Sequence, residues 1–287
     1  MTAASRPPTP DRPIRPDERS GVLHPDNLIR YDARWVAPDP AVEAVVDQYW
    51  SVSWALSSGE RLDQRIIDLP AITVTVEDGD VPAPLVVTGI QRGAWRRTIH
   101  GRGHVFAIRL RPAALTVVGD LDPAAIADAA VPLTETLDPR LHALMRQIAR
   151  QSTTAARARV ADEAIRSRLI ERPPTATGLL ANAVLDELRA RLRSRTGTDL
   201  AMQFHVSERT IERALTDTLG HGPKWVSRRV RLQEVALALA TKTDDDLSAI
   251  AAELGYTDQS HLARDFRAVA GVAPSTYRRD LARLRTG

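Results

Sequence analysis

Two arginines, Arg213 and Arg264, could read DNA, because a guanidinium group offers paired donors that match the acceptors on a guanine edge. They stand 51 positions apart (264 − 213 = 51), and each lies in a segment that repeats the other. A single arginine on a helix surface is most often only a solvated charge. The repeat makes base recognition the favoured interpretation of this pair.

The repeat also includes residues that shape the backbone. Three further pairs keep the same interval of 51: Leu215 and Phe266, Gly220 and Gly271, and Pro223 and Pro274. A constant interval over several residues indicates duplicated architecture, which here covers 199–232 and 247–278.

Each copy is expected to form two helices separated by a turn. In the second copy, apolar residues follow helical spacing from Leu247 to Leu254, and Gly255 can adopt the left-handed conformation that ends a helix. Thr257 or Asp258 can cap the next helix. The second helix of such a pair can enter a major groove. The pattern therefore predicts helix-turn-helix motifs at 199–220 and 247–271.

These segments resemble the DNA-binding domain of AraC/XylS-type transcriptional regulators, most clearly in AAELGYTDQSHLARDFRAVAGVAPSTYR at 251–278. The resemblance covers roughly 179–287 and implies two helix-turn-helix units joined by a long central helix over 224–241. It also implies that Arg213 and Arg264 face base edges or phosphates. The first unit departs from the family pattern, since His205 stands where glycine is usual in the turn and Ala214-Leu215 replaces Leu-Phe.

The two predicted recognition helices turn polar side chains outward. Arg209 and Arg267 could bind phosphates, which position the protein without reading sequence. His261 could contact a base or make a local cap interaction, and Glu212 could accept from cytosine or, as we favour, hold a neighbouring arginine. The expected DNA contacts are Arg209, Glu212, Arg213, Thr216, Thr257, Gln259, Ser260, His261, Arg264 and Arg267.

Composition excludes several classes of chemistry. The absence of cysteine rules out disulfides, thiolate metal sites, cysteine nucleophiles and the alkyl-accepting repair reaction of some relatives. Residues 179–287 carry 17 basic and 14 acidic side chains, and residues 1–178 carry 22 of each. This small excess suits a binder that relies on placed contacts. Without a long apolar run or an apolar leader, no membrane association and a bacterial cytoplasmic location are expected.

Residues 21–130 are expected to form a β-rich sensor domain. Short β-branched segments occur at 71–80, 84–90, 95–101 and 104–112, separated by Gly, Pro or Asp. The stretch RLRPAAL at 109–115 resembles the sensor halves of actinobacterial members of the family, which implies effector sensing or dimerisation.

Helical patterns follow the strands, at 122–130 and from about Pro139 to Ile170. Residues 131–178 are therefore expected to be a helical linker or a dimerisation region, and the Pro-rich residues 1–20 a disordered tail. The predicted fold class is α+β: a β-rich sensor domain with a helical linker, then an all-α double helix-turn-helix domain over 179–287.

Four tryptophans of the sensor half are candidate effector-binding residues: Trp35, Trp50, Trp54 and Trp95. Aromatic side chains can line a pocket for a planar or apolar molecule. A role as core or interface anchors is the favoured alternative. His100 and His104 lie close together in IHGRGH, but the glycines between them indicate a hairpin with surface histidines, so neither a metal site nor a cofactor is expected.

Together these features predict a sequence-specific transcriptional regulator that inserts two recognition helices into adjacent major grooves of double-stranded DNA, about 34 Å apart. A small-molecule effector or homodimerisation would act through the N-terminal domain, and RNA polymerase is a candidate partner. The alternative is an enzyme domain fused to a DNA-binding module. Against it, the sequence lacks G-x-S-x-G, a phosphate-binding loop and H-E-x-x-H, so no catalytic residues are expected.

Overall fold

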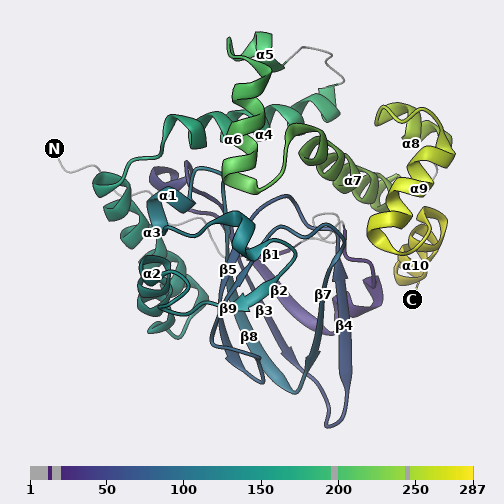
Figure 1. Cartoon of the computed structure of the whole chain (residues 1–287). Helices are drawn as coiled ribbons and strands as arrows, with labels where there is room; N and C mark the ends of the chain where they lie inside the picture. The colour runs from purple at the N-terminus through teal and green to yellow at the C-terminus, as the bar shows by residue number, and fades with distance from the viewer. Residues whose placement is uncertain (1–11, 15–20, 195–199, 243–245, 287) are drawn as a thin grey trace.

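The computed structural model describes residues 12–14, 21–194, 200–242 and 246–286. Its N-terminal half is built on a seven-stranded antiparallel sheet and a separate two-stranded sheet (Figure 1). In spatial order the sheet contains β1 (Arg12–Pro13), β2 (Tyr31–Val36), β3 (Val46–Ala55), β8 (Arg102–Leu110), β5 (Thr73–Gly79), β6 (Leu85–Thr88) and β9 (Ala130–Pro132). The smaller sheet pairs β4 (Arg61–Ile66) with β7 (Trp95–His100), two antiparallel strands that β5 and β6 separate in the chain. For its two-stranded shape, this pair is called the β4–β7 hairpin below.

The two faces of the sheet bury different neighbours, because successive side chains of a strand point to opposite sides. Phe106 and Ile108 of β8 belong to the main core with the helices of this half. Val105 and Ala107, on the other face, pack with Leu62 of the hairpin. The helices on the main-core side are α1 (Leu115–Val118), α2 (Pro139–Ala149) and α3 (Thr154–Glu171).

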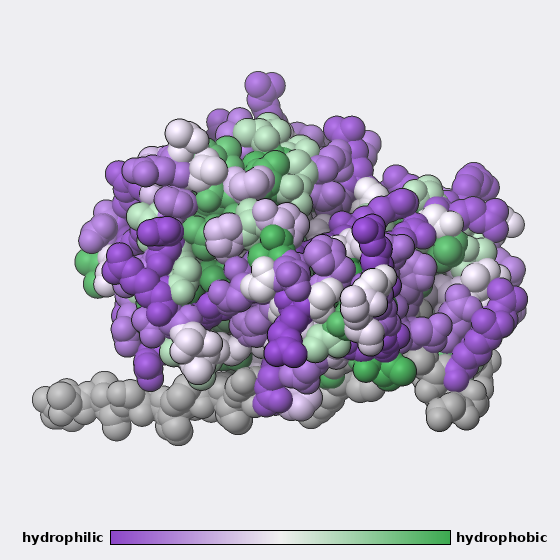
Figure 2. All heavy atoms as spheres, turned by 90° about the horizontal axis from the view of Figure 1, so that it is seen from below, coloured by the Kyte–Doolittle hydropathy of each residue, from purple (hydrophilic) through white to green (hydrophobic). Residues whose placement is uncertain are grey.

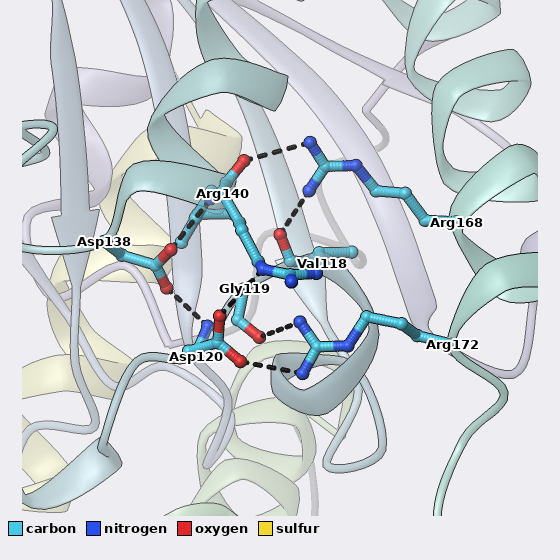
Figure 3. A network of polar contacts seen from close by, with 8 residues as sticks. Val118, Gly119, Asp120, Asp138, Arg140, Arg168 and Arg172 are labelled. Atoms are coloured by element: carbon cyan, nitrogen blue, oxygen red, sulfur yellow. Dashed lines mark hydrogen bonds and ion pairs between the residues drawn. The ribbon is translucent and has the colours of Figure 1, made fainter.

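A polar network fixes these helices to one another (Figure 3). The Asp138 carboxylate, almost fully buried, caps α2 by accepting from the Leu141 N–H at 2.9 Å and also accepts from the Asp120 N–H at 2.7 Å. The Asp120 carboxylate in turn pairs with Arg140 of α2 at 3.1 Å and with Arg172, which follows α3, at 2.7 Å. The loop after α1 is thereby tied to both longer helices.

The structure corrects several sequence expectations in this half. The helical stretch expected from Pro139 to Ile170 is two helices, broken at 150–153, where Thr153 caps α3 through the Ala156 N–H. The pattern at 122–130 forms a short 3-10 helix, η4 (Pro123–Ile126), and the start of β9. Proline at the first turn and a capping aspartate favour only a brief turn there.

The turn through Gly101 does not close a hairpin. It joins β7 to β8, which lie in different sheets, since β7 pairs with β4 and β8 pairs with β3 and β5. The expected disordered tail, 1–20, lies mostly outside the described residues. Its described part, 12–14, adds to the sheet edge as β1, and Ile14 is buried.

Among the described residues of the C-terminal half, all regular elements are helices. Its elements are α4 (Ala176–Ser194), α5 (Leu200–Gln203), α6 (Glu208–Leu219), α7 (Pro223–Thr241), α8 (Leu247–Glu253), α9 (Gln259–Ala270) and α10 (Pro274–Thr286).

Helix α4 joins the two halves of the chain. Its Asn182 accepts from the Ala113 N–H at 3.1 Å and donates to the Ala44 carbonyl at 2.8 Å. Its Val184 shares one hydrophobic core with the sheet and with Leu215 of α6. The boundary expected between 178 and 179 falls inside this helix.

On the face seen from below, polar residues cover most of the surface, and apolar residues gather in a patch between them (Figure 2). Across the described residues, every helix falls short of the length or apolarity needed to cross a bilayer.

Candidate nucleic-acid interface

The first helix-turn-helix unit consists of α5 and α6. The Ser207 hydroxyl accepts from the Thr210 N–H at 3.1 Å and so caps α6, while Gly220 ends it with φ 72° in the left-handed region. The buried stripe of α6 is Ile211, Ala214, Leu215 and Leu219. This spacing puts the helix's polar side chains on its opposite, exposed face.

The second unit, α8 and α9, repeats this plan. The Asp258 carboxylate accepts from the His261 N–H at 2.7 Å, and Gly271 ends α9 with φ 71°. Leu262, Phe266 and Ala270 are buried. Of the two caps considered from the sequence, Asp258 is the one that bonds the helix.

The turns of the two units differ by one residue. The left-handed position is His205 (φ 52°) in the first unit and Gly255 (φ 71°) in the second, an interval of 255 − 205 = 50. The caps, Ser207 and Asp258, are already 51 apart (258 − 207 = 51). The second turn is therefore one residue longer, and the constant interval seen in the sequence begins at the caps.

The left-handed backbone at His205 explains why glycine is usual at this position of the family pattern. Glycine adopts such a φ freely, whereas a residue with a Cβ is strained there. Histidine retains the turn at some expense of stability.

Most of the expected DNA contacts lie on exposed faces of the two units. Arg213 and Arg264 are both exposed, and so are the other residues named from the sequence except His261: Arg209, Glu212, Thr216, Thr257, Gln259, Ser260 and Arg267. Ser260, Arg264 and Arg267 lie on one helix, α9, and Thr257 lies in the turn before it. The structure thus brings these side chains together as two exposed polar surfaces.

His261 is the member of this set that is partly buried. Its ring meets the Tyr256 ring edge-on, with centroids 5.3 Å apart. Its geometry favours a local packing role over base contact. The Glu212 carboxylate lies against Gly222, at the start of α7, where an added Cβ would collide with it.

A bidentate ion pair that sequence patterns do not reveal holds α9 to α7. Arg228 donates through Nε and Nη2 to the Asp265 carboxylate at 3.1 and 2.9 Å. The two residues are 37 positions apart, beyond the reach of helical periodicity. This pair helps fix the orientation of the second recognition helix.

In the sensor half, three tryptophans share the sheet face that the β4–β7 hairpin covers. The Trp35 and Trp50 rings meet edge-on at 5.9 Å, and the Arg109 guanidinium lies 5.7 and 5.2 Å from their centroids. Trp54 is buried and donates from Nε1 to the His100 carbonyl at 2.9 Å. Trp95 lies apart from them, on β7 opposite Ile66.

Polar groups are buried in the same space between the sheet and the β4–β7 hairpin, which we call the tryptophan interior. Glu77, 3% exposed, pairs with Arg97 through contacts of 2.6 and 3.0 Å, and Arg97 lies over the Trp54 ring at 5.8 Å. Gln64 is 6% exposed, and neither of its amide atoms has a hydrogen-bond partner among the described residues. An unpaired buried amide is unfavourable, and a ligand could supply its partner.

An open groove of about 800 Å³ lies beside Trp54, between the ends of β2, β3, β5 and β8. His104 lines it and is not the surface histidine expected from the sequence: its Nδ1 lies 3.3 Å from Arg157 and its Nε2 lies 3.3 Å from the Thr154 hydroxyl. Burial and the nearby Arg157 lower the pKa of His104, against the opposing effect of Asp78. Within the described part of the chain, no three His, Asp or Glu side chains cluster as metal ligands would.

Comparison with known proteins assigns both halves to recognised domains. Residues 200–280 match the family model of a helix-turn-helix domain, and residues 34–132 match a domain of unknown function (DUF6597). The two matched ranges contain the two polar surfaces and the tryptophan interior, respectively.

Two relatives align with the C-terminal part. The chain is 29% identical over 85 residues to an uncharacterised HTH-type transcriptional regulator, YisR, of Bacillus subtilis, and 34% identical over 79 residues to the HTH-type transcriptional activator RhaS of Pectobacterium atrosepticum. These alignments cover 30% and 28% of this chain, and 29% and 28% of the respective relatives.

Among solved structures, ToxT of Vibrio cholerae is similar at 8% identity with a TM-score of 0.43, over 81% of this chain and 98% of ToxT. The helix-turn-helix match and the two regulator relatives agree with the duplicated units. Residues 200–280 therefore form a helix-turn-helix domain of the AraC type, similar to those of these two transcriptional regulators.

Proposed function

We propose that this protein is a sequence-specific regulator of transcription that places α6 and α9 in adjacent major grooves of double-stranded DNA, and that it acts in the bacterial cytoplasm. The observation that carries the proposal is the pair of matched units, each with a capped helix whose buried stripe leaves Arg213 or Arg264 exposed. Two such helices can read two short elements about one helical turn apart.

The donor groups of the exposed arginines suggest the role of each residue within these surfaces. Arg213 and Arg264 make bidentate contacts with guanine, and Arg209 and Arg267 contact phosphates. A binder with a domain charge of only +3 depends on such placed contacts, so its specificity should persist at physiological salt.

Selection of genomic fragments by the purified full-length protein at physiological salt tests this function. We expect enrichment of a motif whose two elements are spaced by about 10 base pairs. Arg213→Ala combined with Arg264→Ala should abolish the enrichment. Arg279→Ala, which removes an exposed charge from α10, serves as the matched control and should retain it. Absence of enrichment by the unaltered protein would contradict the proposal.

We further propose that a small-molecule effector regulates the protein by binding between the sheet and the β4–β7 hairpin. The unpartnered Gln64 amide, the Glu77–Arg97 pair and the Trp54 ring meet there, which suits a molecule with a planar apolar part and a hydrogen-bonding group. RNA polymerase contact and homodimerisation are further proposals for the same regulator.

A thermal-shift screen of a metabolite panel, with tryptophan fluorescence as a second signal, tests the effector site. Gln64→Leu should stabilise the free protein, because it removes an unpaired buried amide, by about 1–3 kcal/mol. It should also abolish the shift given by any compound that binds there. A compound that shifts both proteins equally binds elsewhere.

A further inference from the structure

The β4–β7 hairpin and the loop before β7 contact the end of the second recognition helix. The Arg65 guanidinium of β4 donates to the Ala270 carbonyl, and the Ala94 N–H donates to the Val269 carbonyl at 3.1 Å. Both acceptors are in the last turn of α9, where helix carbonyls lack partners within the helix. A Cβ on Gly271, the next residue, would collide with Arg65.

Further contacts connect the sensor half to the helices around α9. The Tyr277 hydroxyl of α10 accepts from the Gly21 N–H at 3.3 Å, and Arg229 of α7 pairs with Asp68, two residues beyond β4. Leu23, Ile67 and Ala94 are buried in the same hydrophobic cluster as Phe266 and Tyr277. The sensor half therefore holds the second unit through a continuous surface.

This surface leaves the DNA-facing residues uncovered. Gln259, Ser260 and Arg264 are exposed, and the polar contacts of the hairpin fall on the last turn of α9. Since recognition helices contact bases mainly through their N-terminal residues, the hairpin does not occlude the groove-facing side.

The opposite face of the β4–β7 hairpin packs against the sheet inside the sensor half. Side chains alternate along β4, so Gln64 is directed with Leu62 into the tryptophan interior while the next residue, Arg65, reaches α9. Two consecutive residues of one strand thus connect the interior to the second recognition helix. A shift of β4 caused from inside must move Arg65 too.

We propose that Arg65 is a positioning residue, through which the β4–β7 hairpin sets the orientation of α9 and transmits changes in the sensor interior to it. This inference rests on the proposed DNA-binding function and specifies how that function is regulated. The hairpin holds the two recognition helices at the separation that a two-element site requires, and releasing it makes their separation variable.

The test compares Arg65→Ala with Arg96→Ala in the full-length chain. Arg96 is the cross-strand neighbour of Arg65 and is exposed, so both variants remove one positive charge from the same place in the hairpin. Affinity is measured for a fragment with both elements and for a fragment with only the element read by α6. We expect Arg65→Ala to weaken binding of the two-element fragment by about 5- to 20-fold and to leave the one-element fragment unchanged. Arg96→Ala should match the unaltered protein on both.

A second readout does not need DNA. Amide hydrogen exchange of the full-length variants should show faster exchange in α9 and α10 for Arg65→Ala, with no change in α6. If the unaltered protein selects no DNA, the function has failed, and this exchange pattern still decides whether Arg65 positions α9. Equal exchange in the two variants overturns the proposal, and so does tighter DNA binding by Arg65→Ala, which would make the hairpin an inhibitor.

Discussion

Arg229 of α7, only 2% exposed, donates from Nε to the Asp68 carbonyl at 2.9 Å and forms an ion pair with the Asp68 carboxylate. The two residues are 161 positions apart and join the sensor half to the central helix of the DNA-binding domain. A buried guanidinium needs such a partner, because an unpaired charge in the interior is strongly unfavourable. The pair therefore makes the two halves depend on each other for stability.

We predict that Asp68→Ala lowers the free energy of unfolding by about 3 kcal/mol, since it leaves the Arg229 charge buried with only a main-chain partner. Arg229→Met should have a smaller effect, because the remaining Asp68 carboxylate is partly exposed and water can solvate it. Urea unfolding of both single variants and the double variant measures the coupling. A double variant as unstable as the sum of the two singles would show that the pair contributes nothing.

Arg264→Ala should relax sequence preference at one position of the site and reduce specific affinity by about 1–3 kcal/mol. The physical reason is loss of a bidentate contact with a base edge. Competition binding against single-base variants of the selected site measures it. A uniform loss across all DNA sequences would assign Arg264 to a phosphate instead.

His205→Gly should stabilise the protein by up to about 1 kcal/mol, because glycine adopts the left-handed φ of 52° without the clash that a Cβ makes. His205→Ala keeps the Cβ and should give no gain. Thermal unfolding of the two variants separates the backbone effect from any role of the imidazole. Equal stabilisation by both would mean that the ring itself is unfavourable.

Acid should weaken the contact between α3 and the sheet. The folded-state pKa of His104 lies below its ordinary value, so the folded state binds fewer protons than the unfolded state. Its contribution to stability is therefore present above about pH 6.5 and is lost as the pH falls through the folded-state pKa. We expect His104→Asn to flatten the pH dependence of unfolding between pH 7 and 5. His100→Asn, at an exposed position, is the control and should keep the original slope.

The helix-turn-helix units could be predicted because their signals are local. Apolar spacing, a capping side chain and a terminal glycine all fall within one helix and its turn, and α7 begins at Pro223, one residue before its expected start. The constant interval also fixed the correspondence of the two recognition helices.

Much of the sensor half could not be predicted in the same way. Strands β2, β3 and β4 carry polar residues on buried faces, such as Gln64. Their sequences therefore lack the regular alternation of apolar and polar residues that predicts a half-buried strand. The acidic residues Asp68 and Glu77 each pair with an arginine from a distant element. Such pairings depend on tertiary packing and leave no pattern along the chain.

The shared core around α4 makes the two recognition helices unequal. Helix α6 shares the hydrophobic core of the sensor sheet, whereas α9 packs in a separate hydrophobic cluster, which includes Leu23, Ile67 and Ala94 of the sensor half. On an operator, the element under α6 would then be the fixed reference point. Any tolerance for the spacing between elements would then come from the second cluster, which joins α9 to α7, α10 and the sensor half.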